Sequence, residues 1–335
     1  MDKIDTLPMT EGTGIFVYCE QAGGKLRQVS YELLGKAREL ADSCGQTVTA
    51  LVVGDGLALE AAGLGQYGAD RVILVESEEL AQPMELRYTE ELAAILQQYR
   101  AQVLLLGATI FGRSLAPRLA ARLKTGLTAD CTRLEMERAT GRLLQTRPAF
   151  GGNLMATIIC PDTRPQMATV RPRVFHSPAP VQGRTAELIR RPPVGGMTAV
   201  RLLQVLKNQN DCNIADADVL VSVGLGIGNE KNIALASELA ALLGGTWSAS
   251  RPLVDRGMAP FLRQVGQTGK TVCPKLYIAC GISGSVQHMA GVAADTIVAV
   301  NTDPDAPIFQ YAHYAVVADC VSFLQELVAQ LRQEK

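Results

Sequence analysis

Apolar runs of strand length alternate with helical patterns over the first part of the chain. Stretches of about 10–15 residues with helical periodicity lie between these runs. The runs are GIFVYCE (14–20), TVTALVVG (47–54), RVILVE (71–76) and AQVLLLGAT (101–109). Buried strands joined through helices predict a parallel, doubly wound sheet.

The pattern changes between residues 127 and 175, where only β-like stretches occur. We expect these stretches to form antiparallel strands that finish the first domain. Segment 176–196 is rich in Pro and Gly, lacks periodicity and predicts a linker or a strap. The first domain is therefore expected to span residues 1–196.

The alternation resumes in residues 197–335, which predict a second domain. The expected strands are ADVLVSVG (217–224), TWSAS (246–250), PKLYIACG (274–281), TIVAVN (296–301) and YAVVAD (314–319). The fold class is α/β with two doubly wound domains, Rossmann-like or flavodoxin-like, the first of them finished by antiparallel strands.

Composition excludes several classes of function. The net charge of -1 gives no electrostatic footprint for nucleic acid. The start of the chain lacks the apolar segment of a signal peptide, and no run reaches the ~20 apolar residues of a membrane span. The 8 cysteines form no C-x-x-C pair, which indicates reduced thiols and no metal site. We expect a cytoplasmic protein with no membrane insertion.

Two glycine-rich motifs suggest nucleotide binding. Gly269-Lys270-Thr271 resembles the end of an ATP-binding P-loop, but Gln264 stands where that motif needs its first glycine. GLGIGN (224–229) follows a strand and precedes a helix, as a dinucleotide fingerprint does, but it lacks the third glycine. A tight turn that simply needs small residues is the stronger interpretation, with an NAD site as the alternative.

Polar side chains gather where successive strands of the second domain end. Ligands of doubly wound sheets bind outside the carboxyl ends of the strands. The side chains there are Ser250, Arg251, Thr268, Ser283, Gln287, His288 and Asn301. They provide hydrogen-bonding groups and two potential cations, but no nucleophile–base pair, so they favour holding a polar cofactor over hydrolysis. Taken singly, Arg251 could be a surface ion pair, Thr268 a turn residue and His288 a structural residue.

Long motifs in both halves resemble the electron-transfer flavoprotein alpha subunit. In the second half they are SRPLVDRG (250–257), VGQTGK (265–270), GISGSVQH (281–288) and VNTDPDAPIF (300–309). GLTADCT (126–132) and PQMATVRPRVF (165–175) resemble the first domain of the same family. The resemblance covers most of the chain.

This resemblance implies a bound FAD, held mainly by the C-terminal domain. It places Arg251 against the isoalloxazine, Thr268 near N5 and His288 near the C2 carbonyl. It also assigns Ser283 and nearby amides to the pyrophosphate, and Asn301 and Asp319 to the adenosine end. The full set of expected contacts is Ser250, Arg251, Val265, Gly266, Gln267, Thr268, Ser283, Gly284, Ser285, Val286, Gln287, His288, Asn301, Asp319 and Cys320. One position departs from the family, because Leu225 replaces a cofactor-contacting arginine.

The resemblance further implies a heterodimer in which the N-terminal domain contacts a beta subunit. KTGLTADCT (124–132) and IICPDTRPQMATVRP (158–172) look most like members that bifurcate electrons from NADH. The expected function is an electron relay between a beta-subunit flavin or an acyl-CoA-type dehydrogenase and a redox partner, with ferredoxin or flavodoxin as a separate protein. Whether the chain is an enzyme subunit or a simple carrier stays open. The alternatives are a non-redox adenine-nucleotide-binding regulatory subunit and a nicotinamide dehydrogenase.

Overall fold

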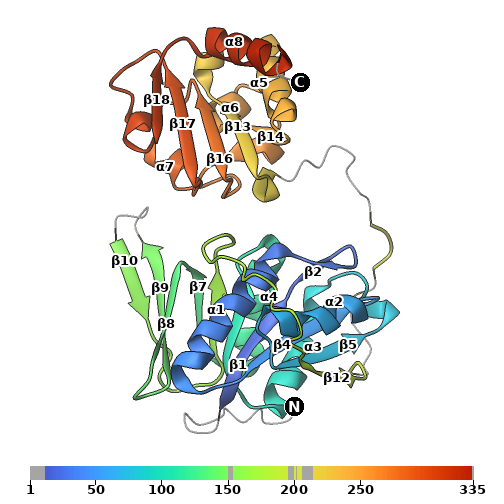
Figure 1. Cartoon of the computed structure of the whole chain (residues 1–335). Helices are drawn as coiled ribbons and strands as arrows, with labels where there is room; N and C mark the ends of the chain where they lie inside the picture. The colour runs from blue at the N-terminus through green and yellow to red at the C-terminus, as the bar shows by residue number, and fades with distance from the viewer. Residues whose placement is uncertain (1–11, 150–153, 195–199, 201, 206–213, 334–335) are drawn as a thin grey trace. The chain divides into compact units, whose positions relative to one another are not determined.

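The chain divides into two compact units, Met1–Leu202 and Leu203–Lys335. The computed structural model describes all residues except 1–11, 150–153, 195–199, 201, 206–213 and 334–335 (Figure 1). The boundary predicted between residues 196 and 197 lies outside the described residues.

The first unit is built on a seven-stranded sheet with the order β12-β5-β4-β1-β6-β11-β7. All neighbouring strands in it are parallel, as a doubly wound sheet requires. The strands are β1 (Thr13–Cys19), β4 (Val48–Gly54), β5 (Arg71–Glu76), β6 (Ala101–Gly107), β7 (Leu127–Cys131), β11 (Gln166–Val170) and β12 (Glu187–Arg191). The central strands are buried throughout, which explains their nearly continuous apolar sequences.

Helices cover both faces of this sheet and bury a separate apolar core on each (Figure 1). Leu33 and Leu34 from α1 pack on one face, and Leu92 from α3 and Leu115 from α4 pack on the other. The helical elements are α1 (Gln28–Cys44), α2 (Ala58–Gly63), η1 (Leu64–Tyr67), η2 (Glu78–Leu80), α3 (Glu85–Gln98) and α4 (Ile110–Leu123). A short hairpin of β2 (Gln21–Ala22) and β3 (Lys25–Leu26) precedes α1.

The prediction that residues 127–175 form only antiparallel strands is wrong in part. Strands β8 (Arg133–Glu137), β9 (Arg142–Ala149) and β10 (Leu154–Ile158) do form an antiparallel sheet. The flanking strands β7 and β11 instead join the parallel sheet. The sequence of β11, QMATV, does not look like a buried parallel strand, because it contains polar residues. These side chains are buried, and hydrogen bonds to other strands and loops satisfy them. Gln166 binds the backbone of Leu143 and Gly141, and the hydroxyl of Thr169 accepts from the Asp130 amide.

The segment predicted as a linker or strap contains a strand. β12 extends the parallel sheet beside β5. Its charged side chains pair across the surface, Arg190 with Glu76 and Glu187 with Arg71, and this polarity made an edge strand look irregular. The described part of the segment before residue 195 therefore runs along the first unit.

The second unit repeats the parallel arrangement with six strands in the order β15-β14-β13-β16-β17-β18. All of its neighbouring strands are parallel. The strands are β13 (Val219–Val223), β14 (Thr246–Ser250), β15 (Gln264–Val265), β16 (Leu276–Cys280), β17 (Thr296–Asn301) and β18 (Tyr314–Val317). The two sheets confirm the predicted α/β class with two doubly wound domains.

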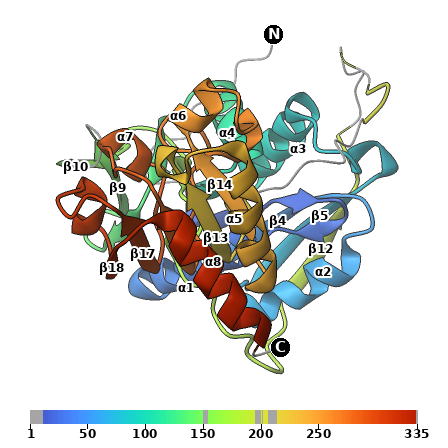
Figure 2. The same ribbon diagram turned by 90° about the horizontal axis from the view of Figure 1, so that it is seen from above.

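Figure 2 shows α5 and α8 lying side by side on one face of this sheet, where they bury the larger apolar cluster of the unit. The helical elements are η4 (Ile214–Asp216), η5 (Leu225–Ile227), α5 (Glu230–Leu242), α6 (Arg251–Asp255), η6 (Phe261–Arg263), α7 (Val286–Met289), η7 (Pro307–Gln310) and α8 (Cys320–Gln333). Among the described residues, no helix has the length and apolar character needed to span a bilayer.

Candidate cofactor site in the second unit

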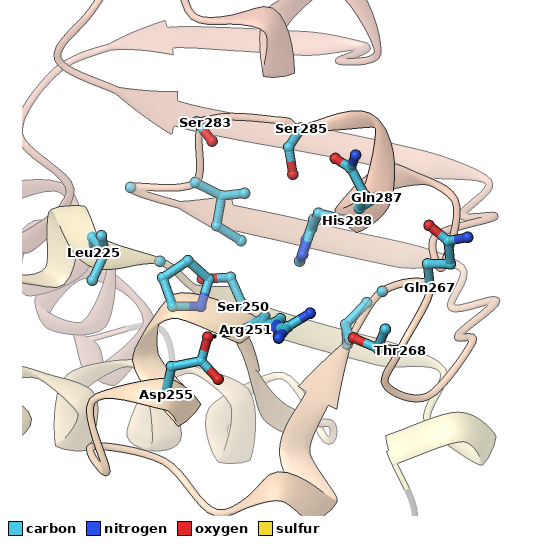
Figure 3. Close-up of a pocket in the computed structure, with 16 residues that line it drawn as sticks. Leu225, Ser250, Arg251, Asp255, Gln267, Thr268, Ser283, Ser285, Gln287 and His288 are labelled. Carbon is cyan, nitrogen blue, oxygen red and sulfur yellow. Dashed lines mark hydrogen bonds and ion pairs between the residues drawn. The ribbon is translucent and has the colours of Figure 1, made fainter. Parts of the chain in front are cut away.

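A cavity of about 560 Å³ opens among the loops that follow four strands of the second sheet. These strands are β13, β14, β15 and β16, which are neighbours, so their carboxyl ends meet at one edge. Figure 3 shows Ser283 and Ser285 on one side of the cavity, with Arg251 and Asp255 opposite them. The predicted site residues that line it are Ser250, Arg251, Val265, Gly266, Gln267, Thr268, Ser283, Ser285, Gln287 and His288.

A second cavity, of about 240 Å³, adjoins the first. Gly281 and Ser283 line both cavities, so the two cavities lie next to each other. The predicted residues Asn301, Asp319 and Cys320 line the second cavity. Two neighbouring cavities that share Ser283 suit a ligand whose two large groups are joined by a short polar bridge.

Gly284 and Val286 do not line either cavity. Gly284 has φ +85°, and a Cβ atom there would lie 2.3 Å from the amide nitrogen of Ile308. Glycine at this position therefore allows two loops to approach each other. Val286 begins α7 with its side chain 52% exposed.

The glycines of the GLGIGN motif serve a close backbone approach. A Cβ atom at Gly224 would lie 2.3 Å from the Gly281 carbonyl oxygen, and one at Gly226 would lie 2.6 Å from the Gly281 Cα. The Gly226 amide also donates to the Gly281 carbonyl at 3.1 Å. This packing accounts for the motif without a nicotinamide cofactor. Leu225 lines the cavity with 41% exposure and brings no charge to it.

Arg251 is the first residue of α6 and lines the cavity with a 61% exposed side chain. Its Nε atom lies 3.3 Å from Oδ2 of Asp255, one helical turn later (Figure 3). Asp255 also lines the cavity, although the sequence analysis did not select it. The i, i+4 spacing was the available signal. The cavity therefore holds a guanidinium whose field is reduced by a neighbouring carboxylate.

His288 is buried and uncharged, so the prediction that it supplies a second cation is wrong for the protein without a ligand. Its side chain is 6% exposed, and burial lowers its pKa to about 4, against a weaker opposite effect of the Val265 backbone. Its Nε2 atom lies 2.8 Å from the hydroxyl of Tyr277, which is fully buried.

The loop after β15 presents Thr268 to the cavity. The Gln267 amide donates to the Gln287 carbonyl at 2.7 Å, which ties this loop to α7. Gly266 has φ +134°, and a Cβ there would lie 3.0 Å from the same carbonyl oxygen. The hydroxyl of Thr268 accepts a hydrogen bond from Nε2 of Gln264 at 3.0 Å.

Asn301 and Asp319 shape the second cavity through their own hydrogen bonds. Nδ2 of Asn301 donates to the Ile282 carbonyl at 3.0 Å, which fixes the loop after β16. The carboxylate of Asp319 accepts from the amide and the hydroxyl of Ser322. These two bonds lower its pKa, so it stays ionised and able to accept from hydroxyl groups. Further lining residues that the sequence analysis missed are Thr302, Asp303, Ala306 and Pro307.

The donor set fits an FAD molecule. Serine and threonine hydroxyls, side-chain amides and one guanidinium can bind phosphates and ring carbonyls. The close approach of the backbone at Gly266, which lines the cavity, is a feature of a site shaped for a ligand.

Comparison with known proteins agrees with the geometry. Residues 15–194 match the electron transfer flavoprotein domain, and residues 213–293 match the electron transfer flavoprotein FAD-binding domain. The electron transfer flavoprotein subunit alpha of Thermoanaerobacterium thermosaccharolyticum is 45% identical over 98% of this chain and 100% of its own length. Protein FixB of Clostridium saccharobutylicum is 44% identical over 96% of both chains. Subunit LctC of a lactate dehydrogenase (NAD(+),ferredoxin) from Acetobacterium woodii is 41% identical over 95% of this chain and 77% of its own.

Proposed function

This chain belongs to the electron transfer flavoprotein alpha-subunit family and has FAD as its cofactor. From this premise we propose that the two neighbouring cavities of the second unit hold the FAD. In this role the chain relays electrons between a donor flavin and a redox partner. The observation that carries the proposal is that loops from four neighbouring strands bring ten predicted contact residues around one cavity.

FAD supplies one- and two-electron redox chemistry, and the protein supplies binding, orientation and electrostatics. Arg251 places a permanent positive charge beside the ring, which favours added negative charge there. Thr268, which lines the cavity, would donate to the N5 edge of the ring. His288 acts as a neutral group near the C2 carbonyl, since its low pKa keeps it uncharged at neutral pH. Ser283 lines both cavities and would bind the pyrophosphate between them.

The adenosine end would occupy the second cavity, which Asn301 and Asp319 line. An ionised carboxylate is an acceptor for ribose hydroxyls, whereas it would repel a phosphate. This chemistry favours the orientation in which the ring lies beside Arg251. Leu225 stands where the family has an arginine, so the first cavity has less positive charge here than in other family members.

The test is the visible absorption of the purified protein, because bound flavin is yellow. The full chain, copurified with its partner subunit, should bind FAD, and a chain ending at Pro192 should bind none. FAD bound in stoichiometric amount to the shorter chain would contradict the assignment of the site. A colourless full-length protein that binds adenine nucleotides would favour the non-redox regulatory alternative.

The partner is proposed to be an electron transfer flavoprotein beta subunit, contacted by the first unit. An acyl-CoA dehydrogenase-type flavoenzyme and ferredoxin or flavodoxin are the proposed redox partners. The LctC relative belongs to a lactate dehydrogenase whose name gives both NAD(+) and ferredoxin, and this supports flavin-based bifurcation from NADH. Two FAD per heterodimer would support it, and one FAD would indicate a simple carrier.

The seven described cysteines are free thiols, in keeping with a cytoplasmic location.

A further inference from the structure

The loop of residues 264–270 is folded around Gln264. The carbonyl of Gln264 accepts from the Lys270 amide at 2.8 Å, and the Gly269 amide donates to the Gly266 carbonyl at 3.0 Å. β15 pairs with β14 through Ala249, opposite Gln264, so the backbone of Gln264 is held from both sides. This residue is the one that breaks the P-loop motif in the sequence.

Gly269 leaves the space that the Gln264 side chain needs. A Cβ atom at Gly269 would lie 2.4 Å from the Gln264 carbonyl oxygen and 2.9 Å from its Cγ atom. Neither backbone can move away, because each is hydrogen-bonded within the same loop. Gly269 is therefore required by the close approach of the Gln264 backbone.

The Gln264 side chain is directed at Thr268. Gln264 is 3% exposed, and its Nε2 donates to the Thr268 hydroxyl at 3.0 Å. A buried amide without a partner is costly, so this bond holds both side chains in place. Thr268 is exposed within the cavity, whereas Gln264 does not line it.

The direction of this hydrogen bond fixes what Thr268 can do. A hydroxyl has one hydrogen to donate and two lone pairs. Because the Gln264 amide donates to the oxygen, the hydroxyl hydrogen stays available for an acceptor in the cavity. We propose that Gln264 is a positioning residue, which holds the Thr268 hydroxyl as a hydrogen-bond donor to the ring of the bound cofactor. This inference rests on the proposed placement of the FAD ring beside Thr268.

Three variants separate this role from simple packing. Gln264→Glu keeps the shape but replaces the donating amide by an acceptor, so Thr268 must donate to the carboxylate and is lost to the ligand. Gln264→Met keeps the length and can neither donate nor accept strongly. Thr268→Val removes the hydroxyl and keeps a similar volume.

The measurement compares two ligands, FAD and 5-deaza-FAD, in the full chain copurified with its partner subunit. The second ligand carries C–H in place of ring nitrogen N5 and cannot accept the hydrogen bond. The ratio of the two dissociation constants therefore isolates this bond and cancels general effects of charge or packing. A neutral hydrogen bond corresponds to a preference for FAD of about 2- to 12-fold.

We expect Gln264→Glu and Thr268→Val to abolish the preference for FAD over 5-deaza-FAD that the Thr268 hydrogen bond provides. Gln264→Met should reduce this preference at least about 2-fold. Adding Gln264→Glu to Thr268→Val should change the ratio no further. An unchanged ratio in Gln264→Glu or, should that variant not fold, in Gln264→Met would overturn the proposal. A further fall in the double variant would also overturn it. Wild-type protein that binds neither flavin would instead contradict the proposed function itself.

Discussion

At the scale of single residues, the charge balance around the cavity is set by one pair. Arg251 brings a guanidinium, which is a cation in proteins, while the flavin ring gains negative charge when it accepts electrons. Asp255 lies 3.3 Å from Arg251 Nε and acts in the opposite direction. Both side chains are 61% exposed, so solvent screening keeps each effect moderate.

Two substitutions at this pair should shift the flavin midpoint potential with opposite signs. Arg251→Ala should lower it by tens of millivolts, since about 59 mV corresponds to ~1.4 kcal/mol for one electron. Asp255→Asn should raise it, because it removes the competing carboxylate. Arg251→Lys should restore only part of the potential, since it lacks the planar fork. Spectroelectrochemical titration measures these shifts.

Arg256→Ala is the matched control, because Arg256 is an exposed neighbour that does not line the cavity. It should leave the potential unchanged. If Arg251→Ala behaved like Arg256→Ala, Arg251 would be only a surface ion pair.

His288 makes the stability of the second unit depend on pH. Its pKa is about 4 in the folded protein and about 6.5 when unfolded, so the unfolded state binds more protons between these values. The free energy of unfolding should therefore fall by roughly 3 kcal/mol as the pH falls from about 6.5 to about 4. Above this window the contribution of His288 is constant.

Urea unfolding of the FAD-free protein, followed through Trp247, tests this dependence. Trp247 is the single tryptophan and lies on β14, so its fluorescence reports on the second unit. His288→Gln should remove most of the pH dependence, while carboxylates common to both proteins cancel in the comparison. Equal pH profiles for the two proteins would show that His288 is protonated equally in both states.

At the scale of elements, the sequence predicted where strands lie better than it predicted which strands pair with each other. Nearly continuous apolar runs such as β4 and β6 revealed a parallel sheet directly. The polar side chains of β11 and β12 concealed two further strands of that sheet, one buried by hydrogen bonds and one at a charged edge. Strand direction depends on the path of the connecting chain, and the local pattern does not record that path.

At the site, too, some features follow from the order of elements and others depend on the three-dimensional surroundings of each side chain. The strand-end rule predicted which loops surround the cavity, because it depends only on element order. The charge state of His288 depends on its burial, which no sequence motif describes, whereas the i, i+4 spacing of Arg251 and Asp255 was an available signal for their pairing.

Close packing between η1 and the segment before β12 should be sensitive to one methyl group. A Cβ atom at Gly65 would lie 2.5 Å from the Ala186 amide nitrogen and 2.6 Å from the Thr185 carbonyl carbon. Gly65→Ala should therefore displace this segment and destabilise the first unit by about 1–3 kcal/mol. Hydrogen exchange should show faster exchange of the β12 amides.

Gly63→Ala is the control for this prediction. No atom lies within 4 Å of the corresponding Cβ, and φ is −76°, which alanine adopts readily. This variant should keep wild-type exchange in β12. Equal exchange of the β12 amides in the Gly65→Ala and Gly63→Ala variants would show that the contact at Gly65 does not determine the stability of this segment.

At the scale of the whole molecule, each unit has its own sheet and its own apolar cores. The described part of the predicted linker belongs structurally to the first unit, since β12 pairs with β5. The second unit can therefore move without breaking a strand pairing. This independence suits an electron carrier whose cofactor must approach a large partner.

We expect the second unit to occupy more than one position relative to the first. Spin labels at Glu39 on α1 and Gln330 on α8, both exposed, would report the distance between the units. Because the described strands of the two units share no sheet, the distance distribution should be broad or multiple in the free heterodimer and should narrow when the dehydrogenase partner is added. Labels at Glu39 and Glu135, both in the first unit, are the control and should give one narrow distance throughout. A single narrow distribution between the units, unchanged by the partner, would mean that electron transfer proceeds from one fixed arrangement.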